Sequence, residues 1–260
     1  MLREFSNLAW PDTPYAADMR PFARKTRLLT GMSIQWADEG SAVVPIGAAA
    51  VFIPVHRTSA REITADTLHF GYRSVAMESS GDGADILAFV DSLLIQGRRK
   101  AEIVSWHSFA DDLHALRPLL SKPHAGIEAL GEAWADRTVR ERGTALFIDT
   151  AGDDGTQLDS ALASNALDFG PVLWSFRAPA VLQEVYEVLT IPTVSQEDLV
   201  WHTQHVGAAA LMCALAVALI GGRQAERLTW QESLDLEQSL RLAAWDTMPL
   251  AFDPKPRQAS

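Results

Sequence analysis

Two long apolar stretches near the start of the chain constrain its fold more than any other feature. Residues 28–36 and 42–55 are both rich in β-branched side chains, and the five residues between them, Ala-Asp-Glu-Gly-Ser, are typical of a turn. This pattern predicts an antiparallel hairpin. The second stretch contains Pro45, Gly47 and Pro54. Because proline cannot donate a backbone hydrogen bond, we expect a bulge, an edge position or a break there.

After the hairpin the pattern changes to an alternation of helices and short strands. Apolar residues recur at helical spacing over residues 84–95 and 109–116, and a short buried strand is predicted between them, over 102–106. The remaining predicted elements are a helix over 127–134, a strand over 144–148, and helices over 179–189, 197–220 and 230–245. Antiparallel strands followed by βα units predict an α/β fold, a mixed β-sheet flanked by helices.

The length and composition suit one large domain with a short C-terminal addition. Of the 260 residues, 48% are hydrophobic, which is enough for a substantial core without disulfides. We predict an α/β domain over residues 1–228, and over 229–260 a C-terminal helix with a frayed tail. The single cysteine, Cys213, cannot form an intramolecular disulfide, and its apolar neighbours predict a buried thiol.

Residues 206–222 raise the question of a membrane. This alanine-rich run is shorter than the roughly 20 apolar residues that a spanning helix needs, and it lacks flanking basic anchors. It therefore predicts a buried core helix and no membrane partner. The N-terminus lacks the basic and then apolar order of a signal peptide, so we expect a cytoplasmic protein.

The formal net charge of −11 means that the molecule as a whole repels phosphate. Any affinity for nucleic acid must therefore come from local basic clusters. Residues 24–27, 98–100 and 137–142 are modest candidates, although solvated loops or helix ends explain each of them equally well.

Two carboxylates, Asp111 and Asp112, follow the short strand at residues 102–106 and begin the next helix. In α/β proteins this position is at the carboxyl edge of the sheet, where metals and phosphates are commonly bound. Acidic residues also stabilise a helix N-terminus, so a purely structural role is an equally good explanation.

Four segments, taken in order, resemble the DEDD family of 3′–5′ exonucleases. The segment around Asp112 is similar to the family's second motif, in which an apolar strand and a short loop precede an Asp. Residues 145–150 end in Asp-Thr, as the family's next strand does, and residues 180–192 look like the helix before its Gly-Ile-Pro turn. In residues 199–211, His202 stands where the third motif has its His. The resemblance implies a ribonuclease H-like fold.

The chemistry that the resemblance implies uses two divalent ions, Mg²⁺ or Mn²⁺, held by four carboxylates. Asp112 would be a metal ligand, and His202 would be the general base that deprotonates the attacking water. For His202 and the nearby His205, the alternative is a structural role in the core or at the surface.

The acidic set of this chain departs from the family's pattern at two motifs. Gly207 stands where the third motif has its Asp, and in the tyrosine variant of that motif Val206 would stand there. The Asp-x-Glu of the first motif has three poor candidates, which are Trp10-Pro-Asp12, Ser33-Ile-Gln35 and Pro54-Val-His56. We prefer Asp12 as the second metal ligand, because the hairpin would then supply the second and third strands of the family's sheet.

Two functions follow from the resemblance. The first is a metal-dependent 3′–5′ exonuclease that acts on single-stranded nucleic acid. The second is a pseudo-exonuclease that has kept the fold as a module for binding nucleic acid or for assembly with a protein partner. Retention of Asp112 and His202 favours the first, and the missing carboxylates favour the second. An unrelated α/β protein with an accidental resemblance is the third alternative.

Overall fold

The computed structural model describes residues 2–8, 26–40, 42–120, 123–130, 134, 144–191 and 193–252. Six strands form one mixed sheet in the order β1-β5-β3-β2-β6-β7, so the predicted α/β class is confirmed. These strands are β1 (Leu2–Ser6), β2 (Thr26–Glu39), β3 (Ala42–His56), β5 (Gly71–Met77), β6 (Ile103–Trp106) and β7 (Leu146–Asp149).

The predicted hairpin is confirmed as β2 and β3, which pair antiparallel along almost their whole lengths. Gln35 lies opposite Gly47 and Trp36 lies opposite Pro45, so one extra residue of β3 interrupts the register. Pro45 and Gly47 therefore flank a β-bulge, one of the three outcomes that we expected, whereas Pro54 pairs in regular register with Leu28. A bulge bends the strand and redirects its side chains, and this one lies beside the candidate site described below.

The centre of the sheet is β2, which pairs with β3 on one side and runs parallel to β6 on the other. In chain order the hairpin strands come second and third, after β1, and their equivalence to the second and third strands of the exonuclease family stays a prediction. The described N-terminal strand, β1, pairs antiparallel with β5 at the far edge. Hydrophobic patterning identifies strands but not their order in a sheet, so the edge position of β1 could not be predicted.

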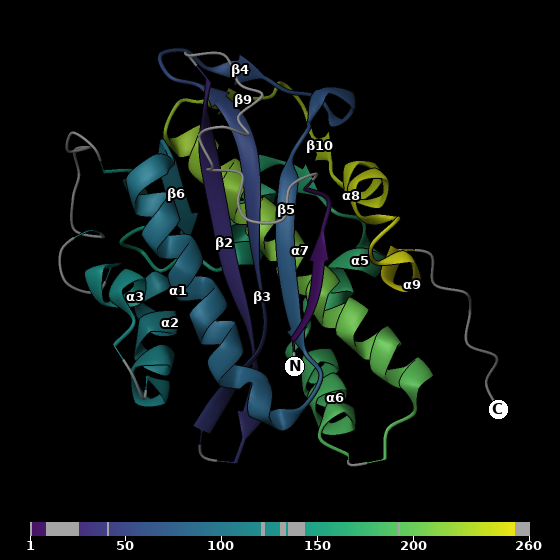
Figure 1. The fold of residues 1–260 in the computed structure, drawn as a ribbon. Helices are drawn as coiled ribbons and strands as arrows, with labels where there is room; N and C mark the ends of the chain where they lie inside the picture. Colours follow the sequence, from purple (N-terminus) through teal and green to yellow (C-terminus); the bar gives the residue numbers. More distant parts are fainter. Residues whose placement is uncertain are drawn as a thin grey trace.

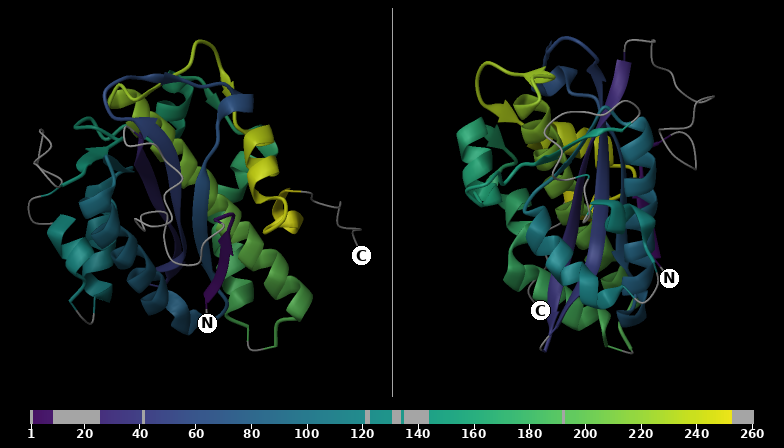
Figure 2. Two further views of the ribbon diagram at one scale, coloured as in Figure 1. Left: turned by 45° about the horizontal axis from the view of Figure 1, so that its top comes forward. Right: turned by 90° about the vertical axis from the view of Figure 1, so that its left-hand side faces the viewer.

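Helices cover both faces of the sheet (Figure 1). On one face α1 lies across β3 and β5, with α2 and α3 beside it, and on the other face α7 crosses β2, β3, β5 and β6 (Figure 2). The helices are α1 (Gly83–Lys100), α2 (Phe109–Leu116), α3 (Ala125–Ala129), α4 (Leu158–Asn165), α5 (Pro171–Trp174), α6 (Pro179–Leu189), α7 (Gln196–Gln224), α8 (Glu237–Ala244) and α9 (Pro249–Phe252). Short 3₁₀ turns are η2 (Ala65–Thr67), η3 (Ser80–Asp82), η4 (Arg117–Leu119) and η6 (Ser175–Arg177).

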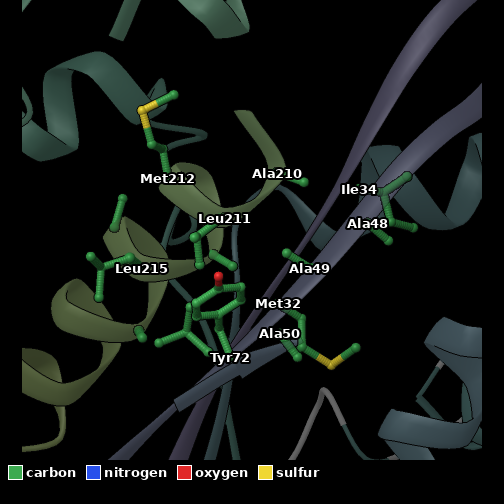
Figure 3. Packing of buried hydrophobic residues seen from close by; sticks show 14 of the residues in the cluster. Met32, Ile34, Ala48, Ala49, Ala50, Tyr72, Ala210, Leu211, Met212 and Leu215 are labelled. Carbon is green, nitrogen blue, oxygen red and sulfur yellow. The ribbon is translucent and has the colours of Figure 1, made fainter. Parts of the chain in front are cut away.

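Helix α7 is the central element of the core. Among the described residues it is the one helix long and apolar enough to cross a membrane, but its apolar stretch is wholly buried within the fold. The prediction of a buried core helix is confirmed. Leu211 on α7 lies over the ring of Tyr72, whereas Met32 and Ile34 on β2 point away from α7 (Figure 3). The alternate residues of β2 therefore face α7.

The C-terminal segment packs on the same core. Four two-residue strands form two small parallel pairs, β4 (Arg61–Glu62) with β9 (Leu228–Thr229), and β8 (Leu167–Asp168) with β10 (Leu234–Asp235). Beyond them, Met248 and Phe252 are fully buried. The helix expected over residues 230–245 is shorter, because residues 234–235 pair as a strand and α8 begins only at Glu237. The predicted tail lies outside the described residues.

Ala166 ends α4 in the left-handed region, with φ of 54°. A side chain with a Cβ is strained there and glycine is not. We expect Ala166→Gly to raise the free energy of unfolding by about 1 kcal/mol. Ala163→Gly, at an exposed position inside the same helix, should lower it by about 1 kcal/mol. Urea unfolding of both variants measures the two changes. If both variants changed the free energy of unfolding in the same direction, this explanation would be contradicted.

Candidate active-site pocket

A small polar cavity of about 250 Å³ lies where β2 extends beyond its shorter neighbour β6. The paired residues of the two strands end at Gly31 and Ser105, and β2 continues to Glu39. The edge of β2 beyond this point is therefore not paired with β6. The cavity is bounded by this edge, by the end of β6, by α2, by α7 and by Arg177 in η6. We call this cavity the β2 pocket.

The side chains that β2 contributes to this pocket are neutral. Ser33 and Gln35 are alternate residues, so they share the face that packs on α7. The Ser33 hydroxyl donates a hydrogen bond of 2.7 Å to the Ala210 carbonyl of α7. Gln35 hydrogen-bonds the thiol of Cys213, which reaches the pocket from α7. Burial raises the pKa of the Cys213 thiol to about 11, so the thiol is protonated at neutral pH.

Asp112 lies in the β2 pocket with both carboxylate oxygens bound by indole groups. Trp36 donates to Oδ1 at 2.8 Å, and Trp106 donates to Oδ2 at 2.6 Å. Burial raises the pKa of this carboxyl to about 7, although the hydrogen bonds from Trp106 and Trp36 act in the opposite direction. Trp36 extends to Asp112 from the part of β2 that lies opposite the bulge in β3. Asp112 is therefore held by two neutral donors and is partly protonated near neutral pH.

The raised pKa of Asp112 predicts how stability depends on pH. The folded protein holds the proton up to about pH 7, whereas the unfolded chain releases it near the model value of 3.8. The folded state thus binds more protons in this window, so the free energy of unfolding falls as pH rises from about 4 to about 7. The fall is roughly 1.4 kcal/mol per pH unit for one fully shifted group.

Asp112→Asn should remove this pH dependence, because asparagine does not titrate. The variant has one acceptor fewer for the two indoles, so at pH 5 its free energy of unfolding should be about 1–3 kcal/mol lower than that of the wild type. By pH 8 the two free energies of unfolding should be about equal, because that of the wild type falls with pH. Urea unfolding at several pH values measures this convergence. The matched control is Asp111→Asn, which changes the exposed neighbour on the same helix. An unchanged slope in Asp112→Asn would contradict the assignment.

A second carboxylate, Asp149 at the end of β7, supports the loop between β6 and α2, which also lines the pocket. Its oxygens accept from the backbone N–H groups of Ser108 and Phe109 at 3.0 and 2.9 Å. Ser108 has φ of 53°, so the turn from β6 into α2 adopts the left-handed conformation. Asp149 stabilises this turn and the start of α2. Next to it, His107 pairs with Thr150 at 2.9 Å, and burial lowers the pKa of its imidazole.

The cationic group of the pocket is Arg177. Its guanidinium carbon lies 4.2 Å from the ring centroid of Trp174, and it forms an ion pair with Asp159. The Asp159 side chain is 63% exposed, whereas that of Arg177 is 22% exposed. Burial lowers the pKa of Arg177, and the nearby Cys213 acts in the opposite direction. A partly desolvated guanidinium with an exposed partner favours an incoming anion.

The site residues named from the sequence do not gather in one place. Asp112 lines the β2 pocket, but His202 does not. His202 is buried on α7 with its ring against Trp201, at 4.8 Å between centroids. Cys213 lies eleven residues further along the same helix, a rise of roughly 16 Å. Asp12, the preferred second metal ligand, lies outside the described residues.

The helix position that faces the pocket is also not the one matched to the third motif. A Cβ on Gly207 would lie 2.8 Å from the ring of Phe5, and Val206 packs where Gly47 leaves room. Both positions face the β1, β5 and β3 side of the sheet. Cys213 is the α7 residue that shares the pocket with Asp112.

The described residues do not fit a two-metal centre. Among them, no group of three or more His, Cys, Asp or Glu side chains could hold a metal ion. In the β2 pocket the positions on β2 are an alcohol and an amide, and the oxygens of Asp112 already accept from indoles. Hard divalent ions prefer several carboxylate oxygens, so we assign no chemical step to Mg²⁺ or Mn²⁺.

Sequence reasoning noted Ser33 and Gln35 as a neutral candidate, but it missed Cys213, Arg177 and the two indole donors. The bulge signal at Pro45 and Gly47 marks the part of β2 that lines the pocket. No comparable local signal marks Arg177 or Cys213, because their neighbours in the pocket are distant in the sequence.

Comparison with known proteins gives no relative: no protein-family model, curated protein or solved structure matches this chain.

Proposed function

We propose that this chain is a ribonuclease H-like module that binds the end of a single-stranded nucleic acid without cleaving it. The order and direction of the strands support the proposed relationship to the ribonuclease H-like fold. A central β2 lies between its antiparallel partner β3 and the parallel strands β6 and β7, with β5 beyond β3. The exonuclease-like segments identified in the sequence correspond to β6 with α2, to β7, to α6 and to α7.

One observation supports the proposal that catalysis has been lost. Beside Asp112, the pocket positions on β2 and α7 include Ser33, Gln35 and Cys213, which are neutral at pH 7, and the other carboxylate of the pocket, Asp159, is paired with Arg177. Two-metal hydrolysis requires carboxylates that hold both ions and align water with the phosphodiester. With Asp112 occupied by Trp36 and Trp106, the described pocket lacks the ligands for that alignment.

Binding is the function that these groups support. Arg177 supplies a guanidinium beside the Ser108 hydroxyl and the amides of Gln35 and Gln157, a combination that suits a phosphate. The net charge of −11 opposes a long polyanion, so we expect a short footprint on the nucleic acid and an affinity that falls as the salt concentration rises.

We also propose a cytoplasmic location, supported by the burial of the apolar helix α7 and by the free, buried Cys213.

The experiment is a fluorescence-anisotropy titration of a labelled 12-nucleotide single strand, as RNA and as DNA, in EDTA. We expect binding by the wild type and about tenfold weaker binding by Arg177→Gln, because one charge-assisted contact is lost. Arg73→Gln is the matched control, since Arg73 also lies over an aromatic ring, Phe89, and pairs with a carboxylate, Glu4. No binding by the wild type, or equal losses in both variants, would refute the proposal.

A second candidate function, assembly with a protein partner, is favoured by a different surface. Leu242 and Trp245, at and just beyond the end of α8, and Leu250 in α9 are exposed by 78%, 47% and 39%. Exposed large apolar side chains of this kind are typical of protein contacts. The double variant Leu242→Ser/Trp245→Ser should keep its stability. If assembly is the function, the wild type should sediment as a larger species than the variant.

A further inference from the structure

A second and larger hollow adjoins the β2 pocket. Its volume is about 800 Å³, and it lies between α4, β8, α5, η6 and the start of α6. We call it the α5 hollow. Asp159 and Arg177 line both cavities, so this ion pair is a shared wall. The volume is within the range of small-molecule sites, which is about 300–1,000 Å³.

The α5 hollow is mainly apolar and contains an aromatic pair. Phe169 and Trp174 stack with their centroids 5.0 Å apart and their planes 20° apart. Pro171 and Pro179 add flat, rigid apolar surface. Surfaces of this kind suit planar aromatic ligands, and nucleobases are the planar groups that a nucleic-acid module meets.

The polar groups at the hollow restrict which base fits. Asp168 and Asp159 are carboxylates, which accept hydrogen bonds but do not donate them when ionised. Oδ1 of Asp168 accepts from Gly170 N at 2.8 Å, and no described residue donates to its other oxygen. An exocyclic amino group, as in adenine, cytosine or guanine, would complement these acceptors. A uracil edge with a carbonyl in that place would not.

Arg177 provides the group for the phosphate. Its Nε is buried and has no hydrogen-bond partner among the described residues. The guanidinium is also paired with Asp159, whose side chain is 63% exposed and which also accepts from the Trp174 indole at 2.8 Å. A phosphate at the shared wall would therefore meet an incompletely satisfied cation, and the attached nucleoside would extend into the α5 hollow.

We propose that the α5 hollow binds one nucleotide with an amino-bearing base, whose phosphate contacts Arg177. This inference rests on the proposed function and deepens it, since the nucleotide would be the end of the bound strand. Asp168 selects the base, and the Phe169–Trp174 pair provides apolar contact.

The test is calorimetric titration of the full chain with CMP and UMP, which differ at C4, an amino group or a carbonyl, and at N3, which accepts in CMP and donates in UMP. We expect CMP to bind about tenfold more tightly than UMP, because one charge-assisted hydrogen bond distinguishes them. In Asp168→Asn this preference should fall to less than about threefold, because a neutral amide can also donate to a carbonyl. Asn can still accept from Gly170, so the turn is preserved.

Two further measurements separate this inference from the proposed function. Arg177→Gln should weaken CMP and UMP equally, and Arg73→Gln should change neither. If the 12-nucleotide strand binds but CMP and UMP bind equally or not at all, the inference about the α5 hollow is wrong and the proposed function stands. If the strand does not bind either, the proposed function is wrong, and the inference about the α5 hollow is wrong with it.

Discussion

Gly31→Val is expected to abolish folding, with a loss of about 5 kcal/mol or more in the free energy of unfolding. A Cβ at Gly31 would lie 2.3 Å from the carbonyl oxygen of Ala214 and 2.5 Å from the amide nitrogen of Ala218. Both are backbone atoms of α7, which cannot rotate away as a side chain can. The whole helix would have to move off β2, and the core would open.

The measurements for Gly31→Val are the soluble yield and the urea unfolding curve. The matched control is Gly81→Ala, because no atom lies within 4 Å of a Cβ built there and its φ is not in the left-handed region. We expect the control to stay within about 0.5 kcal/mol of the wild type. A Gly31→Val protein of normal stability would show that α7 does not pack this closely on β2.

The second large effect is expected from adding carboxylates to the β2 pocket. In the triple variant Ser33→Asp, Gln35→Glu and Cys213→Asp, the added side chains share the pocket with Asp112. Without metal, buried like charges should lower the melting temperature. Mn²⁺ should then restore it, because an ion that binds only the folded state adds about 2.7 kcal/mol at a hundredfold excess over its Kd.

The control for the triple variant is Ser33→Asn with Cys213→Asn, which tests the added volume without charge. Mn²⁺ should raise the melting temperature of the triple variant only, and not that of the control or the wild type. Equal melting temperatures of the triple variant with and without Mn²⁺ would show that these positions do not converge as a metal site. The result therefore tests whether the β2 pocket corresponds to a former catalytic centre.

Local elements were predictable where the sequence has strong local signals. The bounds of α2 and α6, at residues 109–116 and 179–189, are as expected, because periodic apolar residues and prolines define them. The bulge in the hairpin was also signalled, by Pro45 and Gly47. The predicted helix over 127–134 overlaps α3, which is described as Ala125–Ala129.

The candidate site was less predictable, for two physical reasons. Strand order depends on long-range pairing, so nothing local shows that β2 is the neighbour of β6. The face of α7 could not be chosen either, because its residues from His202 to Gly222 are all buried and the helix has no polar side to orient it. The match to the third motif therefore pointed to Gly207, whereas Cys213 lines the pocket.

The most direct measurement of the central claim follows the length of a bound strand. A 5′-labelled 12-nucleotide single strand is incubated for hours with excess wild-type protein and Mn²⁺, and the products are resolved by length. We predict that the strand stays intact under conditions in which anisotropy shows it bound. Stepwise shortening from the 3′ end that disappears in Asp112→Asn would contradict the account and identify the chain as an active exonuclease.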